Sequence, residues 1–72
     1  MLEKLKEIIV DYVDVDPSEI TEASDVRKDL GLNSFDLVNM VVALEDEFGV
    51  SISDKDIVSF YTVSDIIKFL EK

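Results

Sequence analysis

The stretch that decides the fold lies at residues 33–49 and reads NSFDLVNMVVALEDEFG. At about 100° per residue, one side of this stretch carries an apolar stripe, as expected of an α-helix that packs on a core. The stripe consists of Leu37, Met40, Val41, Leu44 and Phe48. Asn33 or Ser34 offers an N-cap oxygen, and Gly49 allows the left-handed conformation that often ends a helix. The sequence therefore predicts a long helix from Ser34 to Phe48.

A second apolar stripe follows the same predicted helix. It lies roughly 100° to 160° around from the first and consists of Phe35, Val38 and Val42. Glu45 and Asp46 flank its far end, and no basic residue occurs between Lys28 and Lys55. A helix with two apolar stripes is either covered widely or offers one stripe to another molecule. We expect a docking face here, with burial under the later helices as the alternative.

Apolar periodicity and capping residues predict three further helices. The first covers about Leu2 to Val13, and a long loop with one helical turn at residues 17–20 follows from about Asp14 to Asn33. A short helix begins after Ser53, and the last runs from about Thr62 to Glu71. The loop has its own candidates for packing, which are Val15, Ile20, Val26, Leu30 and Leu32. The expected fold class is all-α, a small four-helix bundle of three main helices plus one short helix, with a long loop between the first two.

Composition excludes several classes of function. The 72 residues suffice for one domain, residues 1–72. Seventeen acidic residues against seven basic ones give a net charge of −10, which disfavours nucleic acid and favours basic protein partners. Without cysteine or histidine, the chain lacks a cysteine nucleophile, the commonest general base and the cysteine and histidine metal ligands, so we expect no enzyme activity and no dedicated metal site. No signal peptide or membrane span is apparent, and we expect a cytoplasmic monomer.

Ser34 has two interpretations at the start of the predicted long helix. A serine there commonly acts as the helix N-cap. A helix N-terminus also favours phosphate, through its free N–H groups and its dipole. If Asn33 is the cap instead, Asp36 stands at the third helical position and completes an approximate capping box. Local physical chemistry leaves both roles of Ser34 open.

The sequence as a whole resembles the acyl carrier proteins. The resemblance rests on DLGLNSFDLV at residues 29–38, on ALEDEFGV at residues 43–50 and on the Thr62-Val63-Ser64-Asp65 start of the last helix. It implies that a holo-carrier synthase (a phosphopantetheinyl transferase) moves 4′-phosphopantetheine from coenzyme A to Ser34. The thiol of this arm would then carry acyl thioesters among fatty acid or polyketide synthesis enzymes that have basic docking patches.

The resemblance also implies roles for other residues. The partner-docking face comprises Asn33, Phe35, Asp36, Val38, Asn39, Val42, Glu45 and Asp46. A small pocket for the acyl chain would be lined by Leu44, Phe48, Ile52, Ile57 and Val63, although ordinary core packing also explains these five. Asn33, Phe35 and Asn39 depart from the residues common in the family, where Asp, Leu and Glu are usual.

These departures leave the cargo open. Ser34-Phe35 also occurs in D-alanyl carriers, so a specialised carrier of D-alanine or an amino acid is one alternative. A second alternative is an acidic helical adaptor in which Ser34 is only a helix cap. A calcium loop starting at Asp14 is excluded by spacing, because Glu19 stands where an EF-hand needs glycine.

Overall fold

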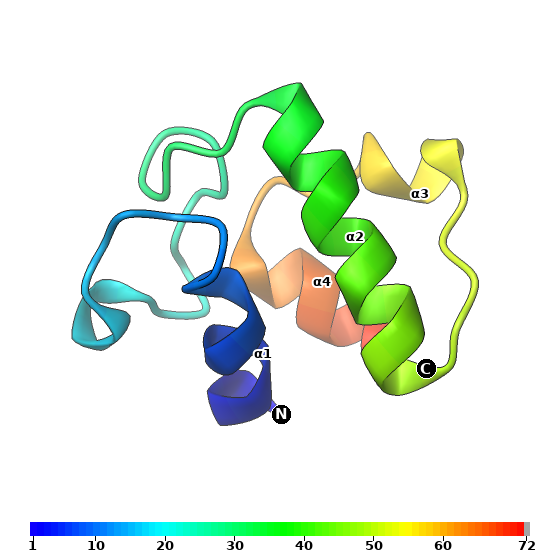
Figure 1. The fold of residues 1–72 in the computed structure, drawn as a ribbon, viewed down its shortest axis with the longest axis horizontal. Helices are drawn as coiled ribbons and strands as arrows, with labels where there is room; N and C mark the ends of the chain where they lie inside the picture. The colour runs from blue at the N-terminus through cyan, green and yellow to red at the C-terminus, as the bar shows by residue number, and fades with distance from the viewer. Residues whose placement is uncertain (72) are drawn as a thin grey trace.

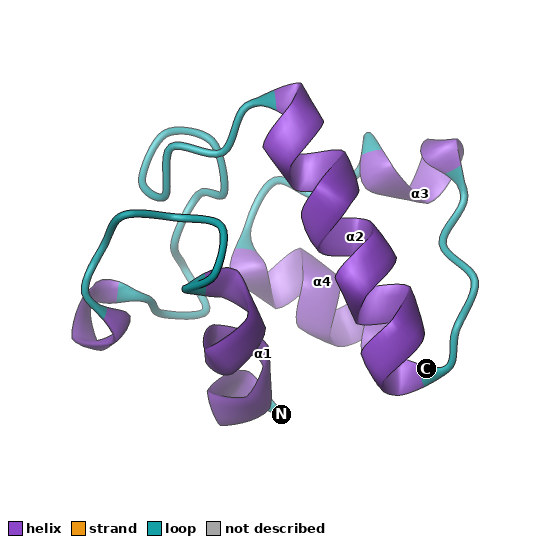
Figure 2. Ribbon diagram, viewed as in Figure 1, coloured by secondary structure: helices purple, strands orange, loops and turns teal. Residues whose placement is uncertain are grey.

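The computed structural model describes residues 1–71, and within them four α-helices form without any strand (Figures 1 and 2). The helices are α1 at Leu2–Ile9, α2 at Ser34–Phe48, α3 at Asp54–Ile57 and α4 at Val63–Leu70. A 3-10 helix, η1 at Pro17–Glu19, supplies the helical turn expected in the long loop. The all-α prediction is confirmed, with three main helices, one short helix and a long loop between the first two.

The core is built around α2. α1 lies beside α2, α4 passes behind it, and α3 lies on the side of α2 away from α1 (Figure 1). The α2 residues Leu37, Met40, Val41 and Leu44 are buried, as the core stripe predicts. Phe48 is only half-buried and packs at the edge of the core, with the Lys4 ammonium 5.6 Å from its ring centroid. No helix within residues 1–71 is both long and apolar enough to span a membrane.

Helix α1 ends one turn earlier than predicted. The apolar pattern continues through Tyr12 and Val13, which are half-buried, but the helix stops at Ile9. The next N–H groups donate to carbonyls three residues back, from Asp11 to Ile8 at 3.1 Å and from Tyr12 to Ile9 at 2.8 Å. The last turn is therefore tightened, as at many helix ends. The prediction that the helix extends to Val13 was wrong.

The long loop is held against the rest of the molecule by its own apolar residues. Ile20, Val26, Leu30 and Leu32 are buried and Val15 is partly buried, so the predicted packing is confirmed. An isolated antiparallel bridge pairs Asp25 with Thr62 at the start of α4. There Val26 N–H donates to Tyr61 O, and Val63 N–H donates to Ser24 O, both at 3.0 Å. These two bonds fix residues 24–26 of the loop to the start of α4.

Short polar side chains cap the last two helices. Ser53 and Asp56 form a reciprocal capping box at α3, and Thr62 and Asp65 form one at α4. Each aspartate reaches back to the N-cap backbone despite its short side chain. The starts predicted for both helices are confirmed.

Candidate functional site

At the start of α2, the side chain that caps the helix and the free hydroxyl belong to two different residues. Asn33 is the N-cap, because its Oδ1 accepts a hydrogen bond of 2.7 Å from the Asp36 N–H. The Asp36 carboxylate does not return a bond to Asn33 within residues 1–71, so the capping box predicted here is only half formed. Ser34 follows the cap, is exposed, and its hydroxyl makes no hydrogen bond to any described residue. The interpretation of Ser34 as merely the helix cap is wrong.

The surroundings of Ser34 fit a phosphate group. The Ser34 and Phe35 N–H groups find no acceptor in the part of the chain that the structure describes. Free N–H groups at a helix N-terminus bind anions, and the helix dipole adds to their effect. A phosphodiester on the Ser34 oxygen would therefore meet unpaired donors, and forming it would leave the Asn33 cap intact.

A groove opens beside Ser34 between α2 and α3. It encloses about 250 Å³, and its lining residues are Arg27, Ser34, Leu37, Val38, Asp54, Ile57 and Val58. Arg27, Asp54 and Val58 were not among the predicted site residues. They come from loop and helix-end positions that apolar periodicity does not mark. The loop carries Arg27 to this place because Val26 and Leu32 are both buried and joined by a 3.0 Å backbone hydrogen bond.

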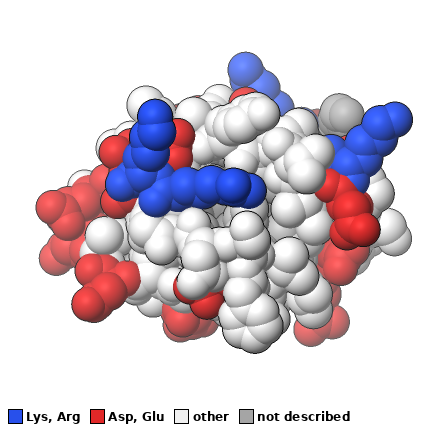
Figure 3. Space-filling view, turned by 90° about the horizontal axis from the view of Figure 1, so that it is seen from above, with Lys and Arg blue, Asp and Glu red and all other residues white. Residues whose placement is uncertain are grey.

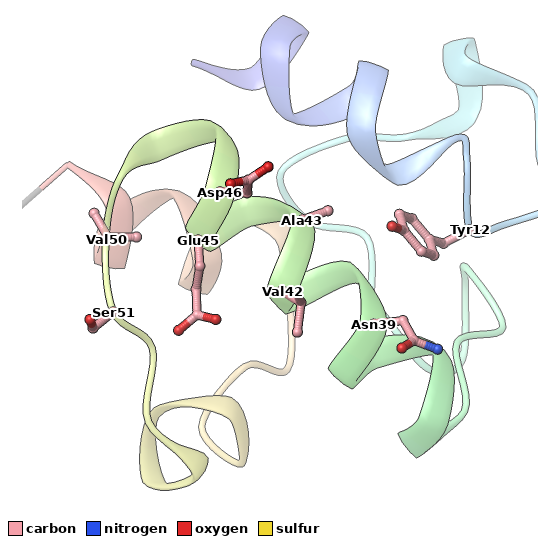
Figure 4. A pocket seen from close by; sticks show the side chains of 8 residues that line it. All are labelled: Tyr12, Asn39, Val42, Ala43, Glu45, Asp46, Val50 and Ser51. Atoms are coloured by element: carbon pink, nitrogen blue, oxygen red, sulfur yellow. The ribbon is translucent and has the colours of Figure 1, made fainter.

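Most of the predicted docking residues lie on an open face of α2. The side chains of Phe35, Val38 and Val42 are 75%, 47% and 57% exposed, so the later helices leave this stripe uncovered. The polar members Asn33, Asn39 and Asp46 are also exposed, whereas Asp36 and Glu45 are half-buried. A shallow hollow on α2 includes Asn39, Val42, Glu45 and Asp46 in its lining (Figure 4). The expected second apolar stripe is confirmed as a surface feature.

Glu45 has a contact that the sequence did not reveal. Its Oε2 accepts a hydrogen bond of 2.7 Å from the Ile52 N–H, and Figure 4 shows its side chain extending from α2 toward the segment that carries Ser51. Its backbone carbonyl also accepts from the N–H groups of Gly49 and Val50. Glu45 therefore holds the connection between α2 and α3, while Asp46 points the other way in the same view.

The five residues predicted to line an acyl pocket divide into two groups. Leu44, Ile52 and Val63 are buried in the core, while Phe48 and Ile57 are partly buried against it. Ile57 also lines the groove beside Ser34. Ile57, like the buried Leu37, therefore lies at the boundary between the surface groove and the apolar core.

Comparison with known proteins agrees with this geometry. Residues 3–70 match a family described as the phosphopantetheine attachment site. Among solved structures, the acyl carrier protein from Enterococcus faecalis is similar, with a TM-score of 0.81 and 32% sequence identity. That match covers 96% of this chain and 87% of the other. Carriers of this family are served by a phosphopantetheinyl transferase and work with synthase enzymes. The chain thus belongs to the acyl carrier family, as a non-catalytic protein that bears 4′-phosphopantetheine covalently.

Proposed function

We propose that Ser34 is the attachment residue and that residues 1–72 form one acyl carrier domain. The observation that carries the proposal is the exposed Ser34 hydroxyl, free of hydrogen bonds to described residues, beside a helix start already capped by Asn33. Attachment joins the Ser34 oxygen to the pantetheine-bearing phosphorus of coenzyme A. The pyrophosphate P–O bond breaks, adenosine bisphosphate leaves, and the hydroxyl proton passes to a base on the transferase.

The arm's thiol holds acyl groups as thioesters, and the chain moves them among fatty acid or polyketide synthesis enzymes in the cytoplasm. The open face of α2 supports this part of the proposal. Phe35, Val38 and Val42 offer apolar area, and Asp36 and Asp46 add negative charge. Such a face suits enzymes with basic docking patches, because complementary charge steers encounter. We propose that the chain acts there as a monomer.

Short acyl chains are proposed to enter the interior beside Ile57. This residue lines the groove next to Ser34 and packs against the buried core, to which Leu44, Ile52 and Val63 belong. Phe48 lies at the edge of the same core. An acyl chain that enters there would replace contacts with water by contacts with apolar side chains, which is favourable per unit of area buried.

Loading of the purified protein tests the proposal. The chain is incubated with coenzyme A, magnesium and a phosphopantetheinyl transferase, and its intact mass is measured. We expect one added phosphopantetheine on the wild type and none on Ser34→Ala. Ser51→Ala is the matched control, because Ser51 is another exposed serine without a hydrogen bond to residues 1–71; it should load normally. Loading of Ser34→Ala, or no loading of the wild type by several competent transferases, would refute the assignment.

A further inference from the structure

Arg27 is a basic residue in the groove that Ser34 also lines. Both residues line the groove between α2 and α3. The guanidinium makes no ion pair or hydrogen bond to any residue in the range 1–71. Four of the six basic residues within residues 1–71, Arg27 among them, make no ion pair. Arg27 differs from the other three because it lines the groove that Ser34 also lines.

The Arg27 backbone is held in a fixed turn. The Asp25 carboxylate accepts hydrogen bonds from the N–H groups of Arg27 at 2.8 Å and Lys28 at 2.7 Å. These bonds, with the one from Lys28 first, lower the pKa of the Asp25 carboxyl. Asp29 in turn accepts from the Asp25 N–H at 2.7 Å. All three bonds use backbone N–H groups of residues 25–28, so they fix the attachment point of the Arg27 side chain without using its guanidinium. The charge of the guanidinium makes a smaller contribution to the lowered pKa of Asp25.

The end of the molecule near the start of α2 carries fewer acidic side chains on its surface than the strongly negative net charge of the chain would suggest. Figure 3 views this end and shows basic side chains lying across a largely uncharged surface, with acidic side chains toward its margins. Within the groove the only other charged lining residue is Asp54. The Asp54 carboxylate would repel an added phosphate. The positive charge of the Arg27 guanidinium offsets this repulsion and attracts the anion to the groove.

The apolar walls of the groove also suit the part of the arm beyond the phosphate. Leu37, Val38, Ile57 and Val58 give it apolar walls, and Val58 is 64% exposed. The first segment of pantetheine beyond the phosphate is a branched dimethyl carbon chain, which favours apolar contact. An arginine can give two parallel N–H hydrogen bonds to phosphate oxygens, which a lysine cannot do.

We propose that Arg27 binds the phosphodiester of the arm and thereby holds the arm along the groove between α2 and α3. The inference rests on the proposed attachment at Ser34. It makes Arg27 a positioning residue, since it touches neither the thiol nor the acyl group. In its absence the arm stays attached but leaves the groove more often.

Nuclear magnetic resonance of the apo and loaded protein tests this role directly. On loading, we expect the Arg27 Nε–H signal and the amide signals of Ile57 and Val58 to shift. These shifts should shrink as salt is raised, because added ions screen an exposed charge pair. In Arg27→Gln, the ratio of docked to free arm should fall by about twofold to fivefold, the range of an exposed ion pair. Arg27→Lys should lie between the two.

Lys28→Gln is the matched control. It removes the same charge from the same turn, but Lys28 does not line the groove. It should keep the wild-type shifts at Ile57 and Val58.

Two outcomes would overturn the inference. The first is that Arg27→Gln and Lys28→Gln change the Ile57 and Val58 signals equally, and the second is that the Arg27 Nε–H signal does not shift when the arm is attached. The intact mass is measured on every sample, so a chain that never gains the arm refutes the attachment at Ser34 instead. If Arg27→Gln does not fold, the wild type alone tests the inference. Loading-induced shifts that do not shrink as salt is raised would then refute the role of Arg27.

Discussion

The Glu45 carboxylate accepts a 2.7 Å hydrogen bond from the backbone N–H of Ile52, seven residues further along the chain. This bond crosses from α2 to the segment before α3. Its neighbour Asp46 is exposed and has no such contact within residues 1–71. Two adjacent acids predicted to serve the same docking face therefore differ in their contribution to the fold.

Replacing Glu45 should weaken the connection between α2 and α3. We expect Glu45→Ala to lower the free energy of unfolding by about 1 kcal/mol, because the Ile52 N–H loses its acceptor in a partly buried place. Asp46→Ala should change it by less than about 0.5 kcal/mol, as usual for surface sites. Urea titration of both variants measures the difference. Equal stabilities would show that the Glu45 bond contributes nothing.

The first turn of α2 offers a test of two adjacent residues. Asn33→Ala should cost about 1 kcal/mol of stability, because the Asp36 N–H loses its cap. Ser34→Ala should leave stability nearly unchanged, since its hydroxyl is free. The loading assay should rank them in the opposite order, with Ser34→Ala inactive and Asn33→Ala active. Thermal unfolding together with intact mass compares the two, and a large loss of stability in Ser34→Ala would contradict the assigned cap.

Acid should remove the contribution of Asp65. Its Oδ2 accepts hydrogen bonds of 3.0 Å from the N–H groups of Thr62 and Tyr61, which lower the pKa of the carboxyl. The stabilisation is therefore fully present above the ordinary aspartate pKa of about 4 and is lost as the pH falls through the lower folded-state pKa. Asp65→Ala should be less stable than wild type at neutral pH, with the gap closing in strong acid.

Asp14→Ala is the control for Asp65. It removes the same charge from an exposed position whose side chain has no hydrogen bond to described residues. Urea titration at neutral pH should show a smaller loss of stability for this variant than for Asp65→Ala, because no side-chain hydrogen bond is removed. A gap for Asp65→Ala that stays constant down to strong acid would count against the role of the carboxylate.

Charge reversal on α2 should slow loading without unfolding the protein. Asp46→Lys should lower the kcat/KM of a basic transferase severalfold, since opposite charges raise association rates by about tenfold or more. Asp11→Lys makes the same change at an exposed site outside the docking face and should have little effect. Rates at low and high salt measure this, and the difference between the variants should shrink as salt is raised. Equal rates at low salt would argue against docking at Asp46.

Features with a regular period were predictable from the sequence. The core stripe of α2 and the caps at Ser53 and Thr62 follow from local spacing, which tertiary contacts then reinforce. The exposure of Phe35 was also expected from its place on the helix. Such features depend on residues a few positions apart, so one sequence contains the information.

Features that depend on distant contacts were not predictable. The position of Arg27 in the groove that Ser34 lines follows from the burial of Val26 and from hydrogen bonds to the start of α4. The bond from Ile52 to Glu45 similarly joins two elements. The end of α1 was misjudged because apolar spacing continues through a turn that is no longer α-helical. Resemblance, and not periodicity, distinguished the carrier function from a plain helix cap.

The bridge between Asp25 and Thr62 makes the long loop and the start of α4 one cooperative unit. Val26 N–H and Val63 N–H are donors in the same short ladder, so solvent reaches either only when the pair separates. Their amide protons should therefore exchange with deuterium at similar free energies of opening, despite belonging to different segments. The loop at residues 24–26 would then exchange its amide protons as slowly as a helix, although it has no regular secondary structure. Arg27 would therefore follow a segment of the loop that opens rarely.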